Sequence, residues 1–450
     1  MSNPSVEFIH SAKWANLPAS TQLMAKQCLL DLLGVAASGT RTHLSRIISD
    51  HAAQHFAAGD SGRGARLLFD GRSCSPAGAS LSNGMTIDSI DAHDGHKPTK
   101  GHAGCGVLPA VLAILDSETL AANVTEEELL TCIVVGYEIA CRAGIALHAS
   151  VPDYHTSGAW VALAAAAIGA RILKLSEQQT REALGIAEYH GPRSQMMRCI
   201  DHPTMLKDGS GWGAMAGVSA AYLAQSGFTG APAITMESAA EAPLYKDLGS
   251  NWLISEQYFK PYPVCRWAQP AIVAAMRLQA EHNFDIADIS MLSIGTFHES
   301  GRLATAIPTT TEQAQYSLPF PVAAALKKRQ LTVTEIEGDG LADSVVLKLS
   351  KSIELHEVEA YNNEFPARRI SDVTITLHNG CVFESGPTEA DGDPESPLSS
   401  DEMTAKYFRF AAPVLGEERS RALADRVGSM GNESRNLDGF YPLIYTAGAS

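Results

Sequence analysis

The segment from Ala159 to Leu175 constrains the fold of this chain most, because nearly all of its residues are apolar and most are small. A helix that is apolar on nearly every face has no side to turn to water, so we predict that it lies at the centre of a helical bundle. Small side chains there allow neighbouring helices to pack closely. Its longest apolar run, Trp160 to Ala170, stops after eleven residues. A bilayer span needs roughly twenty, so we expect a core helix and no membrane helix.

The rest of the first half of the chain also has helical periodicity. Between Thr21 and Ser38, apolar residues recur at spacings of three and four, which favours an amphipathic helix. The predicted helix ends are a stop at Gly39 and N-terminal caps at Thr125 with Glu128 and at Ser176 with Gln179. This half is therefore predicted to be a set of packed helices.

The pattern changes after about residue 255. The runs Met291 to Phe297 and Val373 to Leu377 alternate and are rich in β-branched residues, as strands are, and Asn379-Gly380 directly after the second run is a strong hairpin signal. The acidic stretch from Glu384 to Asp401 is typical of a linker, and helical periodicity returns from Asp401 to Met430. We expect a mixed α+β domain after the first set of helices. The helices predicted after Asp401 could then pack against that first set.

Composition excludes several classes of partner. The 450 residues carry 34 Lys+Arg against 50 Asp+Glu, a formal net charge of -16, which opposes binding to nucleic acid or to an anionic membrane surface. The first residues lack the basic start and apolar stretch of an export signal, so we expect a cytoplasmic protein. The eight cysteines include no Cys-x-x-Cys pair, which fits neither a disulfide framework nor a zinc ribbon.

The densest group of titratable residues lies in a segment broken by Gly95, Pro98 and Gly101, which indicates a loop. Its titratable members are Asp88, Asp91, His93, Asp94, His96 and His102. Three interpretations compete: a metal site, for which no recognised ligand spacing is present, a solvated loop without a role, and acid/base chemistry. We favour the last, because imidazole titrates near neutrality and a neighbouring carboxylate orients it.

Three further segments hold candidate residues. His155 precedes the buried helix, where it either faces a cavity or caps the helix. Lys207 stands in a Gly-rich helix entry that is not a phosphate-binding loop, so it either grips a carboxylate or is solvated. Lys260 and Arg266 lie among aromatic and proline residues at the proposed domain boundary, where they either bind a carboxylate or stack on aromatic rings. Neither a Rossmann Gly-x-Gly-x-x-Gly nor a Gly-x-Ser-x-Gly elbow occurs in the chain.

Several motifs together resemble the MmgE/PrpD family, which includes 2-methylcitrate dehydratase, cis-aconitate decarboxylase and iminodisuccinate epimerase. They follow the family's order over most of the chain: Asn83 to Asp94, Gly101-His102, Val107 to Ala110, Gly136-Tyr-Glu138, His155 to Gly158, Gly227 to Gly230, Phe259 to Pro263 and Gln315 to Phe320. The resemblance implies an α+β multidomain fold: a helical bundle domain from residues 1–258 and 402–450, and an inserted, smaller α+β domain from residues 259–401. It also implies a homodimer and a site between the domains that needs no cofactor and no metal.

Carried over position by position, the resemblance makes Asp91, His102, His155 and Lys260 the catalytic candidates. We expect His102 and His155 to transfer protons and Asp91 to orient them. The substrate-binding candidates are Lys207, Arg266, Thr204, Gly95, Phe320 and His96. Four of these mark three departures from the family pattern: Gly95 replaces a common threonine, Phe320 replaces a tyrosine, and Lys207 stands at a usual histidine position with Thr204 at the usual lysine position.

The reactions of this family share the making or quenching of a carbanion next to a carboxylate. Such a step needs an acid/base pair and fixed positive charge. We therefore expect a cofactor-free lyase that removes water from a small hydroxy di- or tricarboxylic acid. An epimerase or a decarboxylase on a related acid is the alternative within enzymes, and a catalytically silent binding or scaffolding protein is the alternative outside them. The two missing hydroxyls, at Gly95 and Phe320, predict a substrate that is smaller or less hydroxylated than the best-known tricarboxylates.

Overall fold

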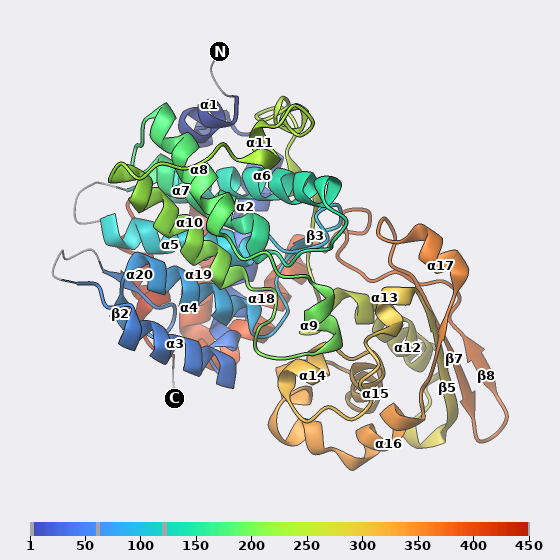
Figure 1. The fold of residues 1–450 in the computed structure, drawn as a ribbon. Helices are drawn as coiled ribbons and strands as arrows, with labels where there is room; N and C mark the ends of the chain where they lie inside the picture. The colour runs from blue at the N-terminus through green and yellow to red at the C-terminus, as the bar shows by residue number, and fades with distance from the viewer. Residues whose placement is uncertain (1–3, 60–63, 119–123, 449–450) are drawn as a thin grey trace.

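A computed structural model describes residues 4–59, 64–118 and 124–448, which form a helical part and an α+β part lying side by side (Figure 1). The helical part consists of α1 (Pro4–Ser11), α2 (Ala19–Gly39), α3 (His43–His55), α4 (Pro76–Asp88), α5 (Gly104–Glu118), α6 (Glu126–Ser150), α7 (Gly158–Ile172), α8 (Glu177–His190), α9 (Met197–Asp201), α10 (Ser210–Gln225), α11 (Ile234–Glu237), α18 (Ser400–Leu415), α19 (Glu417–Ser429) and α20 (Tyr441–Tyr445). Two small ribbons accompany these helices: β1 (Ala65–Arg66) pairs with β2 (Ser73–Cys74), and β3 (Gly95–His96) with β4 (Gln257–Tyr258).

Helix α7 is the buried helix that the sequence predicts. Its residues from Gly158 to Ala170 are all buried, and it packs against α5, α6, α8 and α10. The predicted caps also form: the Thr125 hydroxyl accepts from the amide of Glu128, and Ser176 and Gln179 make a reciprocal capping box. Local sequence therefore sets where these helices begin.

Helix α6 is a long core helix that uninterrupted apolar runs in the sequence do not reveal. Among the described residues it alone is long and apolar enough to cross a membrane by length and composition, but 94% of its apolar window is buried inside the protein. In the sequence, Glu138 and Arg142 divide this helix into shorter apolar runs. Those two charges form a buried ion pair of 2.5 Å within the helix.

The α+β part is built on a four-stranded sheet. Its elements are α12 (Gln269–His282), β5 (Ile289–Thr296), α13 (His298–Gly301), α14 (Thr311–Gln315), α15 (Pro319–Lys328), α16 (Ser344–Ser352), β6 (Glu354–Glu357), α17 (Glu359–Glu364), β7 (Ser371–Leu377) and β8 (Val382–Glu384). The strand order is β6-β5-β7-β8, with β6 parallel to β5 and the other pairs antiparallel. The two predicted strands correspond to β5 and β7. The predicted Asn379-Gly380 hairpin is the turn between β7 and β8, where Gly380 has a φ of 90°. The predicted fold class, a mainly helical α+β protein, is confirmed.

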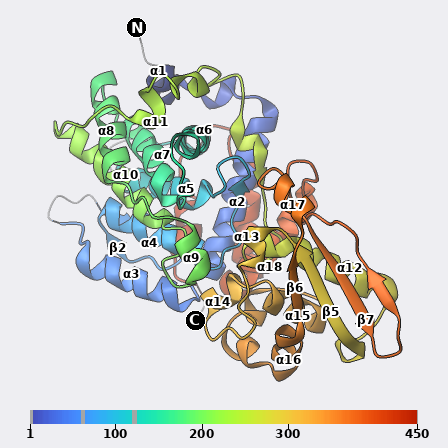
Figure 2. The same ribbon diagram turned by 45° about the vertical axis from the view of Figure 1, so that its right-hand side comes forward.

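The chain returns to the helices at α18, which packs on α2 (Figure 2). The buried Lys406 of α18 forms an ion pair of 2.5 Å with Asp31 of α2, and it donates to the carbonyl of Ala92 at 2.8 Å. The segment before α18 contains no helix or strand from residue 385 to 399, but it is more than the predicted linker. Its Asp393 pairs with Arg266 and Lys97, which fixes the segment against the junction of the two parts.

Candidate active site

A small cavity lies where the two parts meet, and its volume is about 30 Å³. The helical part contributes the loop after α4, which turns back through β3, and the α+β part contributes residues from before α12, after α14 and before β7. The lining residues are Asp91, Lys100, His102, Tyr154, Met196, Ile200, Tyr258, Lys260, Cys265, Arg266, Trp267, Tyr316 and Arg369. Three of the four predicted catalytic residues, Asp91, His102 and Lys260, are therefore brought together.

Asp91 and Lys260 form a buried ion pair at the base of this cavity. Nζ of Lys260 donates to Oδ1 of Asp91 at 2.6 Å and to the Asp91 carbonyl at 3.0 Å. Asp91 holds a left-handed backbone with a φ of 52°, which places its carbonyl and carboxylate on the same ammonium group. Burial alone would raise the pKa of Asp91, but Lys260 and Lys207 outweigh it and hold this pKa below its ordinary value. Asp91 in turn raises the pKa of Lys260 against the effect of burial, so both groups are charged.

His102 is held as a neutral base. Its Nδ1 lies 2.6 Å from the carbonyl of Asp94, and because a carbonyl only accepts, Nδ1 carries the proton and Nε2 is the free base. Burial, assisted by the charge of Lys260, lowers the pKa of His102 well below its ordinary value. The imidazole is therefore uncharged at neutral pH and ready to accept a proton at Nε2.

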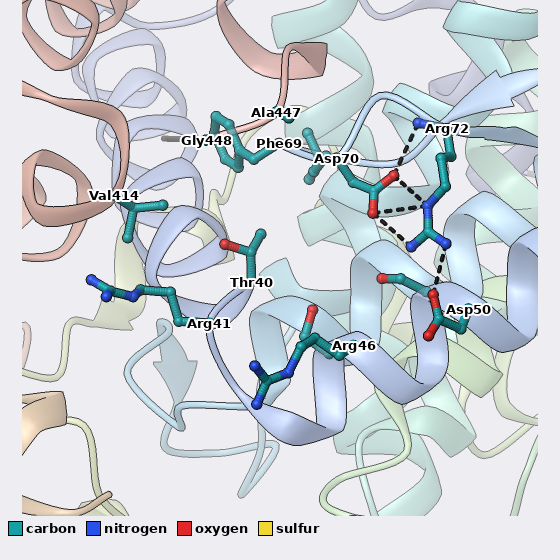
Figure 3. A pocket seen from close by; sticks show the side chains of 13 residues that line it. Thr40, Arg41, Arg46, Asp50, Phe69, Asp70, Arg72, Val414, Ala447 and Gly448 are labelled. Carbon is teal, nitrogen blue, oxygen red and sulfur yellow. Dashed lines mark hydrogen bonds and ion pairs between the residues drawn. The ribbon is translucent and has the colours of Figure 1, made fainter. Parts of the chain in front are cut away.

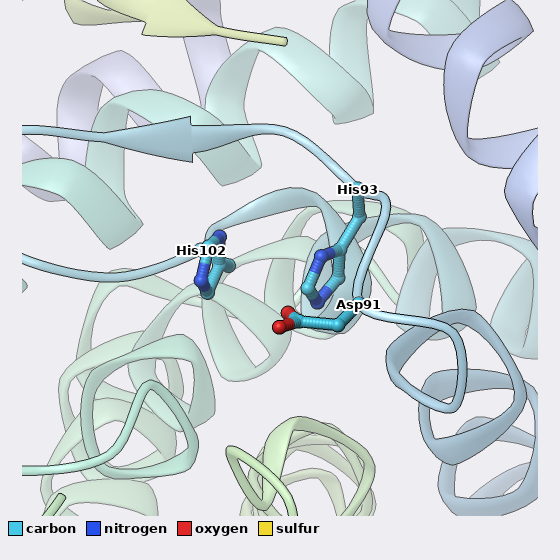
Figure 4. A group of neighbouring side chains, drawn as sticks. All are labelled: Asp91, His93 and His102. Atoms are coloured by element: carbon cyan, nitrogen blue, oxygen red, sulfur yellow. The ribbon is translucent and has the colours of Figure 1, made fainter. Parts of the chain in front are cut away.

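His93 completes the group shown in Figure 4, where the Asp91 carboxylate lies beside both imidazole rings. The rings of His93 and His102 stack with centroids 4.4 Å apart, and ligand-type atoms of Asp91, His93 and His102 lie within 4.8 Å of one another. This donor set suits a divalent metal. However, the ammonium of Lys260 already occupies the position of a cation at Asp91, so a metal would compete with it.

Two buried carboxyls support the cavity from behind. The amide of Asp208 donates to Asp88 at 3.2 Å, and burial raises the pKa of both groups above the ordinary value. The Ser157 hydroxyl donates to Asp208 and accepts from the amide of His102 at 2.9 Å. The carboxyl pair thus fixes the backbone of His102 through Ser157.

The structure places several predicted substrate-binding residues elsewhere. Arg266 lines the cavity, and its guanidinium donates to the carboxylate of Asp393 at 2.6 Å and to two backbone carbonyls, so Asp393 already offsets its charge. Buried Lys207 donates to Gln315, with its Nζ 4.6 Å from the ring centroid of Tyr316. It therefore joins the two parts from outside the cavity lining.

The remaining predicted residues also lie outside the lining. His155 is buried, with its amide donating to Nε2 of His148 at 3.1 Å, and only its chain neighbour Tyr154 reaches the cavity. His96 is buried against Glu256 at 3.2 Å, where it fixes the loop. Thr204 is exposed on the turn before α10.

Sequence reasoning missed Arg369, a buried cation of the site. Its side chain lines the cavity and is only 4% exposed, and its Nε and Nη1 atoms have no hydrogen-bond partner among the described residues. The Cζ atoms of Arg369 and Arg266 lie 5.2 and 4.8 Å from the centroid of the Tyr258 ring. Tyr258 was within reach of sequence reasoning, since it opens the segment that contains Lys260, whereas nothing in the sequence distinguishes Arg369 from its neighbour Arg368.

A larger depression, of about 570 Å³, lies on the helical part and is drawn in Figure 3. Three arginines line it, but Arg72 is paired with Asp50 and Asp70, each at 2.7 Å. It contains no base next to a buried ion pair. We therefore assign the candidate site to the smaller cavity, on its chemistry.

Comparison with known proteins identifies the family of this chain. Residues 6–241 match the MmgE/PrpD N-terminal domain, and residues 262–429 match the MmgE/PrpD C-terminal domain. The chain belongs to the MmgE/PrpD family. The human cis-aconitate decarboxylase is 24% identical over 441 residues, covering 92% of this chain and 88% of that protein. The cis-aconitate decarboxylase of Aspergillus terreus is 23% identical over 453 residues, covering 92% and 89%. Cis-aconitate decarboxylase-like protein oryM of Aspergillus oryzae is 24% identical over 476 residues, covering 94% and 93%.

Two departures from the MmgE/PrpD pattern now have a physical reading. A Cβ atom at Gly95 would lie 2.3 Å from Cζ of Tyr258 and 2.8 Å from Nδ1 of His102, so glycine makes room for the Tyr258 phenol. Phe320 is fully buried in the core of the α+β part and does not line the cavity, whereas Tyr316 does. Two phenol-bearing side chains, Tyr258 and Tyr316, therefore line the cavity, and the prediction of two missing hydroxyls did not include them.

Proposed function

We propose that this protein is a lyase that removes water from a small hydroxy polycarboxylic acid, beginning with removal of a proton from the carbon next to a carboxylate. The observation that carries the proposal is the neutral His102, with its free Nε2, beside the buried Asp91–Lys260 pair in one cavity. A base and a fixed ammonium that line the same cavity are what such a proton transfer requires.

The steps follow from the positions of these groups. Nε2 of His102 accepts the proton, and the electron pair of the C–H bond forms a C=C bond as the C–OH bond breaks. Lys260 stabilises the negative charge that develops on the substrate carboxylate. The Tyr258 phenol, which burial keeps protonated by raising its pKa, donates a proton to the departing hydroxide so that water leaves. Solvent then carries the proton from His102 to the Tyr258 phenolate. Both side chains are thereby returned to the protonation states in which they started.

Decarboxylation is the second candidate, and the printed names of the relatives favour it. In that reaction a C–C bond breaks first and a proton is delivered afterwards, so the group beside the substrate has to start as an acid. His102 starts as a base, because burial lowers its pKa and the Asp94 carbonyl holds its one proton on Nδ1. This protonation state supports dehydration over decarboxylation.

Proton NMR in deuterated water tests the proposal with malate, 2-methylcitrate and cis-aconitate. Dehydration should give an alkene without loss of carbon. If only the proton-transfer step occurs, deuterium should appear at the carbon next to a carboxylate. His102→Gln should abolish both signals. Release of CO₂ from cis-aconitate without exchange in the hydroxy acids would replace dehydration by decarboxylation. No reaction and no exchange with any acid would leave the protein as a catalytically silent binding member of the family.

A further inference from the structure

The charges that line the cavity do not balance. Asp91 neutralises Lys260 at 2.6 Å, and Asp393, from behind the lining, neutralises Arg266 at the same distance. Arg369 and Lys100 also line the cavity, and neither has a carboxylate partner among the described residues. Arg369 and Lys100 are therefore the lining cations that no carboxylate offsets, which favours an anionic ligand.

Arg369 is the more informative of these two cations. Arg369 is only 4% exposed, and its Nε and Nη1 atoms have no hydrogen-bond partner among the described residues. A buried guanidinium in this state is strongly unfavourable unless a ligand pairs with it. Lys100 is only half-buried, so water solvates its ammonium. The planar fork of a guanidinium fits a carboxylate through two parallel hydrogen bonds.

The geometry points to Arg369 as the subsite for the second carboxylate of a small dicarboxylate, and this inference rests on the proposed function for the identity of the other end. The first carboxylate lies at Lys260, beside the base. The Tyr258 ring lies near both ends of the proposed site, since its centroid is 5.2 Å from Cζ of Arg369 and 6.2 Å from the centroid of the His102 ring. At about 30 Å³ the cavity is smaller than a dicarboxylate, so binding requires its lining to widen, and a short dicarboxylate requires the least widening.

Binding of unreactive probes tests the subsite without turnover. Succinate and succinamate, which differ by one carboxylate, are titrated into the protein by calorimetry. The wild type should bind succinate about 10- to 100-fold more tightly, as expected for a charge-assisted pair of hydrogen bonds. Arg369→Gln should remove this difference, and Arg369→Lys should restore it only in part, because an ammonium lacks the fork.

Arg368→Gln is the matched control. Arg368 precedes Arg369 in the chain and pairs with Glu389 at 2.8 Å, but its side chain is 50% exposed. This variant should bind both probes as the wild type does. Circular dichroism shows whether each variant folds, and the wild-type comparison of the two probes stands if Arg369→Gln does not.

The outcomes separate the subsite from the proposed function. Equal binding of succinate and succinamate by the wild type, no binding of either at millimolar concentration, or unchanged discrimination in folded Arg369→Gln would overturn the subsite. Arg369-dependent binding without turnover of any acid would support the subsite while the lyase proposal fails. Where turnover is found, Arg369→Lys should raise KM about 10- to 100-fold with a smaller change in kcat, and an unchanged KM would count against the subsite.

Discussion

Replacement of Lys260 by methionine isolates the contribution of the buried ion pair to the candidate site. Methionine fills much of the volume of the lysine side chain but removes the ammonium, which lies 2.6 Å from Oδ1 of Asp91 and 3.0 Å from its carbonyl. The variant leaves a buried carboxylate without its main partner. Breaking a buried pair in this way costs about 3–5 kcal/mol of folding stability.

The cost should depend on pH, with a sign that follows from the pKa of Asp91. In the wild type this pKa lies below its unfolded value of about 3.9, so the pair stabilises the fold above that pH, and the contribution is lost as the pH falls through the folded pKa. Burial is the largest influence on Asp91, and Lys260 is the strongest group that opposes it, so we expect burial to raise the folded pKa of Asp91 above the unfolded one in Lys260→Met. The variant therefore loses folding stability as the pH rises from the unfolded pKa, about 4, towards the higher folded pKa.

Urea unfolding at pH 5 and pH 8, followed by circular dichroism, measures both effects. The difference in unfolding free energy between wild type and Lys260→Met should be larger at pH 8 than at pH 5. Lys327→Met is a matched control, because Lys327 pairs with Asp343 at the same 2.6 Å but with side chains 27% and 18% exposed. A pair with access to water is worth about 0–1 kcal/mol.

A double variant completes the cycle. Asp91→Asn removes the charge that Lys260→Met strands, so the two changes together should cost less than the sum of the single changes. Equal destabilisation by Lys260→Met at both pH values, or full additivity in the double variant, would refute the reasoning.

Three further outcomes are expected. His102→Gln should fold and lose about 10²–10⁴-fold in kcat/KM, because a positioned base contributes that much, and nearly full turnover would make His102 a structural residue. Gly95→Ala should destabilise the protein by about 1–3 kcal/mol, since its new Cβ would lie 2.3 Å from Cζ of Tyr258. Thermal unfolding of Gly95→Ala in a Tyr258→Ala background should show a smaller loss, and an equal loss in both backgrounds would argue against the contact. Activity should survive dialysis against a chelator, because Lys260 occupies the cation position at Asp91; loss of activity that one divalent ion restores would instead identify a metal site.

The sequence by itself determined the local elements, because their signals act over a few residues. An apolar stretch without a polar face predicts the buried α7, and the Ser176 capping box and the Asn379-Gly380 turn mark a helix start and a hairpin. The MmgE/PrpD motifs likewise identified the family and the loop that carries Asp91 and His102. These features need no knowledge of distant contacts.

Only the tertiary structure decided which cations are free to bind a ligand. Arg266 and Arg369 are equally charged in the sequence, but Arg266 is paired with Asp393, which lies 127 residues later in the chain, while Nε and Nη1 of Arg369 are buried without a partner among the described residues. The tertiary structure likewise distinguishes two nearby aromatic residues: Phe320 is buried in the core of the α+β part, whereas Tyr316 lines the cavity. The reason is physical: the free energy of a buried charge depends on which groups the fold places within a few ångströms of it, and those groups come from segments far apart in the chain.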